Sequence, residues 1–125
     1  MRNDVAYVSF YMRSNTIRIF KSTIRAMGIP KFIRLRIHET EGTMIIEPYD
    51  RITFSSFRVP FPLNDSKEGM DIHSKRFIRI VAALMRWDME RTYRVSGELY
   101  GKLKIVKFDL VQAVKIFMGS RLRPT

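Results

Sequence analysis

Residues 33–37, Ile-Arg-Leu-Arg-Ile, alternate apolar and basic side chains, and this alternation constrains the fold more than any other feature of the chain. Because successive side chains of a strand point to opposite faces, the pattern predicts a strand with one buried and one cationic face. Gly28 and Pro30 are typical of the end of a preceding helix, and the turn 39–42 leads into a return strand over 43–47. The segment is therefore interpreted as a helix, a stop and a β-hairpin.

The other parts of the first half are short predicted elements joined by turns. Aromatic and β-branched residues indicate strands, and apolar residues at helical spacing indicate a helix. The predicted elements are a strand over 5–12, an extended piece over 16–19, a helix over 20–27, two short strands over 52–54 and 57–59, and a polar linker over about 60–69.

The second half has its own helix and hairpin signals. Ser74 is a suitable N-cap, and a glycine-containing turn separates two apolar segments. The predicted elements are a helix over 75–85, an extended segment over 93–95, a turn over 97–101, a return strand over 103–108, and a C-terminal helix from Leu110 to about Met118 capped by Asp109.

The order of elements in the two halves is the same. When Met27 is aligned with Met85, Arg36 falls on Arg94 and Ile37 falls on Val95. Helix, stop, arginine-bearing strand, turn and return strand follow one another in both halves, although few residues are identical. This order predicts an internal duplication within a single domain of residues 1–125, with units at about 5–48 and 70–110.

Several segments of the first unit resemble the AbrB/MazE/SpoVT swapped-hairpin DNA-binding family. They are Ile-Arg-Ile-Phe-Lys-Ser at 17–22, Met-Gly-Ile at 27–29, Leu-Arg-Ile-His at 35–38 and Gly-Thr-Met-Ile-Ile-Glu-Pro at 42–48. The resemblance covers about 16–48 and, more weakly, 72–108. The sequence departs from the family pattern at Phe20, where proline is expected, and at Arg86, which replaces the turn glycine of the second unit.

This resemblance implies an α+β fold: a small β-barrel of two swapped-hairpin-like repeats with short helices, to which the C-terminal helix is added. A unit of about 45 residues cannot bury its hairpin alone, so two units in one chain would complete the core internally. The expected assembly is a monomer with a pseudo-two-fold axis, or a homodimer.

The charge balance indicates a polyanionic partner. The chain holds 23 Lys plus Arg against 12 Asp plus Glu, a net charge of +11. Such an excess attracts nucleic acid, with affinity that falls as salt rises. The resemblance favours Arg18 and Lys21 as contacts near the start of the first helix. Each basic residue taken alone is better explained as a solvated charge on an outer face, and it is their clustering that favours binding by the group. The candidate nucleic-acid contacts are Arg18, Lys21, Arg25, Arg34, Arg36, Arg76, Arg79, Arg91 and Arg94.

Two aromatic residues, Trp87 and Tyr93, have two interpretations. They could stack on the bases of single-stranded nucleic acid. They align with core positions of the first unit, however, and this favours burial.

Several classes of protein are disfavoured by what the sequence lacks. There is no cysteine for a disulfide, a thiol nucleophile or a cysteine zinc site. No apolar run approaches the roughly 20 residues of a membrane span, and the first residues have no signal-peptide layout, so a cytoplasmic location is expected. The only histidines, His38 and His73, fit no metal or catalytic spacing. We therefore expect no metal, no cofactor and no enzymatic activity.

The leading hypothesis is a small duplex-DNA-binding regulator or accessory factor. The alternative is a protein-interaction module, such as an antitoxin or a phage-encoded inhibitor of the anti-CRISPR kind, that docks on a nucleic-acid-processing complex. RNA binding is a third hypothesis, which the lack of an aromatic ribonucleoprotein motif disfavours.

Overall fold

The computed structural model describes residues 6–60 and 68–116, which form a single antiparallel sheet with two α-helices. Two single 3-10 turns, η1 (Met12–Ser14) and η2 (Leu110–Gln112), complete the regular structure of these ranges. The α-helices are α1 (Lys21–Ala26) and α2 (Lys75–Met85). The strands are β1 (Ala6–Tyr11), β2 (Thr16–Phe20), β3 (Phe32–His38), β4 (Thr43–Tyr49), β5 (Ser56–Arg58), β6 (Gly69–His73), β7 (Thr92–Tyr100), β8 (Ile105–Asp109) and β9 (Val114–Ile116).

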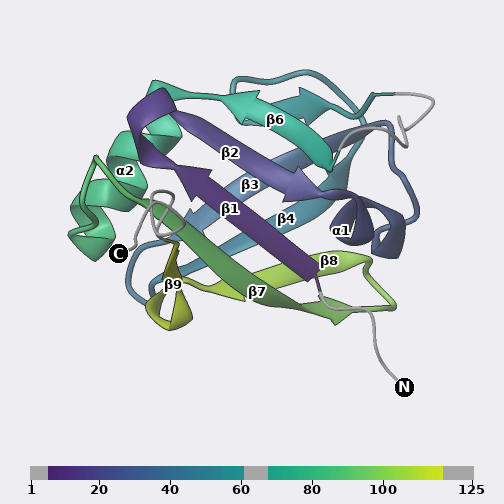
Figure 1. Ribbon diagram of the computed structural model, residues 1–125. Coiled ribbons are helices and arrows are strands. Elements are labelled where there is room, and N and C mark those ends of the chain that lie inside the picture. The colour runs from purple at the N-terminus through teal and green to yellow at the C-terminus, as the bar shows by residue number, and fades with distance from the viewer. Residues whose placement is uncertain (1–5, 61–67, 117–125) are drawn as a thin grey trace.

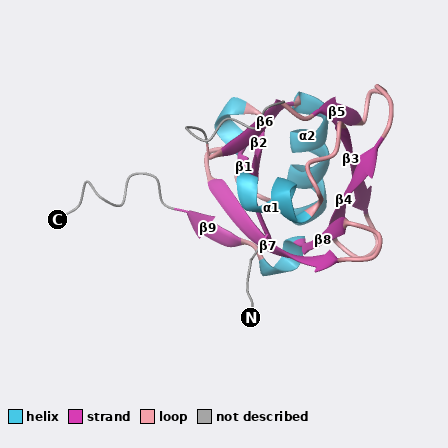
Figure 2. Ribbon diagram, turned by 90° about the vertical axis from the view of Figure 1, so that its right-hand side faces the viewer, coloured by secondary structure: helices cyan, strands magenta, loops and turns pink. Residues whose placement is uncertain are grey.

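The sheet curls into a nearly closed barrel. Its strand order is β5-β3-β4-β8-β7-β1-β2-β6, and β9 lies off this path, paired with β7. Seen along the barrel, the strands form a ring in which the edge strands β5 and β6 come close to each other (Figure 2). Within the described ranges no backbone ladder joins these two edges. The expected α+β barrel with short helices is therefore the observed architecture.

The two helices lie at opposite ends of this barrel (Figure 1). From α1, Ile24 is fully buried, and from α2, Phe77, Ile78 and Val81 turn inward. They meet the inward residues of the strands, which alternate with outward ones because of the strand period of two. The largest fully buried side chains include Phe10, Met12, Ile17, Ile19, Ile33, Leu35, Met44, Ile46 and Phe108.

The α2 helix has the predicted bounds and the predicted cap. The Ser74 hydroxyl accepts a hydrogen bond from the Phe77 amide at 3.2 Å, which satisfies one of the free N–H groups of the first turn. Both helices are followed by a residue in the left-handed conformation, Gly28 (φ 82°) after α1 and Arg86 (φ 56°) after α2.

The predicted C-terminal helix is wrong over the described residues. Leu110–Gln112 form only the single 3-10 turn η2, in which the Asp109 carboxylate accepts from the Val111 amide at 3.1 Å. Residues Val114–Ile116 then form β9, because their backbone pairs with the start of β7. Residues 117 and 118 of the predicted helix lie outside the described residues.

The turn predicted at 97–101 is also displaced. The strand β7 continues through Gly97 to Tyr100, and the turn occupies 101–104. Gly97 is opposite Phe108 in the ladder, and a Cβ added to it would lie 2.6 Å from the Phe108 ring. This glycine therefore makes room for a core aromatic ring instead of forming a turn.

The middle of the chain is only partly as predicted. The short strand expected at 57–59 is β5 at Ser56–Arg58, whereas residues 52–54 belong to a loop. The predicted linker ends where β6 begins at Gly69, and its residues 61–67 lie outside the described residues. Neither described helix is long and apolar enough to cross a membrane.

Substitution of Gly97 by alanine should destabilise the fold by about 1–3 kcal/mol, because the new methyl group overlaps the Phe108 ring. Urea denaturation gives the free energy of unfolding. The double variant Gly97→Ala/Phe108→Leu should lose less than the sum of the single changes, since the smaller side chain relieves the overlap.

Gly101→Ala is the matched control for this substitution. No described atom lies within 4 Å of a Cβ added there, so its stability should match that of the wild type. Equal effects at positions 97 and 101 would contradict the packing argument.

Candidate nucleic-acid interface

The predicted contact residues do not share one surface. Arg18 and Arg94 lie on the outer face of β2 and β7, and Arg34 and Arg36 on the outer face of β3. The other candidates lie elsewhere on the barrel. They are Lys21 and Arg25 on α1, Arg76 and Arg79 on α2, and Arg91 just before β7.

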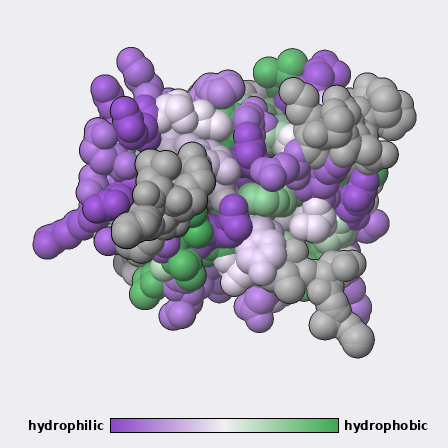
Figure 3. Space-filling view, viewed as in Figure 1, coloured by the Kyte–Doolittle hydropathy of each residue, from purple (hydrophilic) through white to green (hydrophobic). Residues whose placement is uncertain are grey.

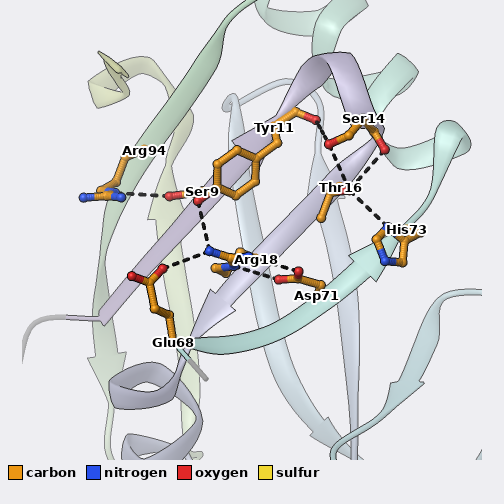
Figure 4. A network of polar contacts seen from close by, with 9 residues as sticks. All are labelled: Ser9, Tyr11, Ser14, Thr16, Arg18, Glu68, Asp71, His73 and Arg94. Atoms are coloured by element: carbon orange, nitrogen blue, oxygen red, sulfur yellow. Dashed lines mark hydrogen bonds and ion pairs between the residues drawn. The ribbon is translucent and has the colours of Figure 1, made fainter. Parts of the chain in front are cut away.

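Arg18 is held by two carboxylates. The register of β2 against β6 places it opposite Asp71, and its Nε and Nη2 donate to the two Asp71 oxygens at 2.8 and 3.1 Å. Its Nη1 donates to Glu68 at 2.8 Å (Figure 4). The hydrogen bond with Asp71 raises the pKa of Arg18 above its ordinary value. The charge of Arg18 is thus offset within the protein and is poorly placed to neutralise a phosphate.

Arg94 belongs to the same face and is also engaged. Its Nε donates to the Ser9 hydroxyl at 3.1 Å, and its guanidinium lies 5.0 Å from the centre of the Phe20 ring. Ser9 is fully buried, although it points to the outer face, because the longer side chains around it cover it. Arg94 therefore packs on the outer face of the sheet, over Ser9 and Phe20.

The arginines of β3 meet an acidic partner on the neighbouring strand. Arg34 is opposite Glu47 in the hairpin and donates to it at 2.6 Å, and this hydrogen bond raises the pKa of Arg34. Arg36 reaches the same carboxylate at 3.7 Å. The alternating arginines that mark this strand in the sequence share one glutamate, so their charge is partly cancelled.

The three other candidates lie in two separate places, Arg91 just before β7 and Lys21 with Arg25 on α1. Arg91 forms an ion pair with Asp88 at 3.6 Å. Lys21 is half-buried and Arg25 is exposed, both on α1 at the end of the barrel away from α2. Lys21, Arg25 and Arg91 therefore form no single patch with Arg76 and Arg79 of α2.

The outer face of α2 is different, because it bears positive charge that no carboxylate of residues 6–60 or 68–116 neutralises. Arg76 and Arg79 are exposed there together with Lys75 and with Arg86 at the C-cap. The stretch 75–87 contains no Asp or Glu. Among the described residues, no carboxylate lies within ion-pair distance of these four side chains. We call Lys75, Arg76, Arg79 and Arg86 the α2 cationic face.

The helical period explains this arrangement. The apolar residues Phe77, Ile78 and Val81 lie on the side of α2 that enters the barrel, so the basic residues fall on the opposite side. Hydrophilic side chains are crowded on the side of the molecule where α2 lies (Figure 3). Lys75 and Arg86 were not predicted as contacts, although the acid-free stretch around them was visible in the sequence.

An exposed aromatic residue borders the α2 cationic face. Phe54, in the loop before β5, has 83% of its surface exposed, and the guanidinium of Arg76 lies 5.1 Å from the centre of its ring. Phe54 is not among the predicted contacts, because no pattern in a mixed segment distinguishes an exposed aromatic residue from a buried one.

Trp87 and Tyr93 contribute to the core. Their rings stack with centres 4.2 Å apart, and Trp87 also meets Phe10 edge-on. Tyr93 is buried, and its hydroxyl accepts a hydrogen bond from the Asp88 amide at 2.9 Å. The burial that the alignment with core positions favoured is confirmed for Tyr93, whereas Trp87 is only partly buried and packs against the core.

In the described part of the chain, no group of three or more His, Asp or Glu side chains could hold a metal ion.

Comparison with protein-family models, with curated proteins and with solved structures finds no match to this chain.

Substitution of Arg18 by alanine should lower the free energy of unfolding and leave DNA binding unchanged. Its ion pair with Asp71 is bidentate and partly shielded, so a double-mutant cycle with Asp71→Ala should give a coupling of about 1 kcal/mol in urea denaturation. A loss of DNA affinity in Arg18→Ala without a loss of stability would show that Arg18 contacts the ligand.

Proposed function

We propose that this chain is a basic nucleic-acid-binding protein that binds DNA through the α2 cationic face, as a small regulator or accessory factor. The observation that carries the proposal is the concentration of Lys75, Arg76, Arg79 and Arg86 on one exposed helix side without acidic partners in the described chain. Four cations on one helix side, none paired with a described carboxylate, attract a phosphate backbone and release its counterions. The net charge of +11 supports the same class of partner.

We thus place the contact surface away from the strand arginines Arg18 and Arg34, of which the family resemblance favoured Arg18. Arg18 and Arg34 each donate to carboxylates. A phosphate that approached them would have to displace those carboxylates and would meet their negative charge. The α2 cationic face carries no such opposition from the described residues.

We also propose that the two halves of the barrel are related by internal duplication, in the manner of a swapped-hairpin domain. The strands β3 and β7 have the same order of buried and exposed residues when Arg34, rather than Arg36, is aligned with Arg94. Each of these arginines is opposite a buried serine on the neighbouring strand, Ser56 for Arg34 and Ser9 for Arg94. These parallels support a common origin of the halves.

A second candidate function, docking on a protein or ribonucleoprotein, has an observation of its own. At the β7–β8 turn the apolar residues Leu99, Tyr100 and Leu103 are 44%, 46% and 68% exposed. Neighbouring exposed apolar side chains are typical of protein-interaction surfaces. They lie at the end of the barrel away from α2, so the two functions can be tested separately.

Fluorescence anisotropy with labelled random-sequence DNA, in single-stranded and duplex form, across a salt series tests the DNA proposal. Affinity should fall steeply as salt rises. The variant Lys75→Ala/Arg79→Ala should bind more weakly. On duplex DNA its slope of log affinity against log salt should be shallower by about 0.9 for each phosphate that the variant no longer neutralises.

The control variant Lys102→Ala removes one exposed positive charge from the β7–β8 turn, at the other end of the barrel. Its salt slope should equal that of the wild type. Failure to bind either form of DNA at low salt would refute the proposal, and capture of a defined protein partner that Leu103→Asp abolishes would favour the docking function.

A further inference from the structure

Phe54 is an exposed aromatic residue on an ordered loop. The Thr53 amide donates to the Ser56 hydroxyl at 2.7 Å, and that hydroxyl donates to the Arg51 carbonyl at 2.8 Å. The loop is also tied to the barrel, because the Leu35 amide donates to the Ser55 carbonyl at 3.1 Å. These bonds fix the backbone on both sides of residue 54, so the ring is presented from a defined position.

The Phe54 ring does not pack into the core. Phe57, further along the same segment, packs edge-on against Phe77 with ring centres 6.2 Å apart, whereas Phe54 remains 83% exposed. A large apolar surface left in water is unfavourable by about 25 cal/mol per Å². An ordered loop that keeps such a ring in solvent is well suited to a ligand that covers it.

The surroundings of Phe54 define the chemistry of that ligand. Arg76 of the α2 cationic face lies over the Phe54 ring, with its guanidinium 5.1 Å from the ring centre, and Arg79 follows one helical turn later. An aromatic face next to cations that no described carboxylate pairs with matches a flat base joined to a phosphate. Single-stranded nucleic acid presents both groups, since its bases stack on aromatic side chains while basic residues follow its backbone.

We propose, on the basis of the proposed function, that the α2 cationic face and Phe54 together form a binding site for unpaired bases of single-stranded DNA. A base stacks on the Phe54 ring, and Lys75, Arg76 and Arg79 contact the phosphates on either side of it. In duplex DNA the base faces are covered by their neighbours, so a duplex gains the phosphate contacts but not the stack. The site therefore prefers single-stranded to duplex DNA, with little preference for base identity.

The test compares a fluorescein-labelled oligothymidine of about 15 nucleotides with an abasic oligomer of the same length and charge. The wild type should bind oligothymidine more tightly than the abasic strand. Phe54→Ala should weaken oligothymidine binding by about 5- to 150-fold, the effect of removing one stacked base. It should leave abasic and duplex binding, and the salt slope, unchanged.

Phe54→Trp is the matched conservative variant. It should keep oligothymidine affinity near that of the wild type, and its added indole fluorescence should be quenched by oligothymidine and not by the abasic strand. Because residue 54 is exposed, both variants should unfold at the wild-type urea concentration.

Each result has a distinct meaning. DNA binding that depends on Lys75 and Arg79 but is unchanged by Phe54→Ala would overturn the stacking site and leave the proposed function standing. An equal loss for oligothymidine and the abasic strand in Phe54→Ala would also overturn it. No binding of any DNA at low salt would overturn both proposals together.

Discussion

The antiparallel register of the barrel determines both its core and its charge distribution. Where β2 pairs with β6, Ile17 and Ile19 face inward opposite Ile72 and Met70, and the same register sets Arg18 against Asp71 on the outside. A slip of one residue would exchange the two faces, exposing the apolar residues and burying the ion pair. The apolar interior thus enforces the pairing that neutralises the strand arginines.

Positive charge is consequently uneven around the molecule. Arg18 of β2 and Arg34 of β3 each have a carboxylate opposite them in the ladder, Asp71 and Glu47, whereas a helix has no such partner strand. On α2 the residues that could offset Arg79 are those three or four positions away, and none of them is acidic. Among the described residues, α2 therefore presents exposed basic side chains that no described carboxylate pairs with. The strand arginines stand out in the sequence because of their alternation, but in the structure their ion pairs make them weaker candidates for phosphate contacts.

The sequence allowed some of these features to be predicted, for local reasons. The bounds of α2 followed from its cap and its apolar period, and the β3–β4 hairpin followed from alternation around a turn. The register of that hairpin also places Arg34 opposite Glu47, a pair that could have been predicted. The pairing of Arg18 with Asp71 could not, because 53 residues separate them and only the barrel brings them together. The prediction of a C-terminal helix was wrong for the same reason, since pairing with β7 overrides an apolar spacing that also suits a helix.

Arg86 illustrates a compromise between stability and charge. It occupies the left-handed conformation, with φ 56°, in which an L residue with a Cβ is disfavoured by about 1–2 kcal/mol, while Gly28 takes this conformation after α1 without that strain. Glycine would relax the backbone after α2 but would shorten the row of cations by one. The chain tolerates conformational strain at the point where a guanidinium extends the α2 cationic face, and a variant selected only for thermal resistance would be expected to accept glycine in place of that arginine.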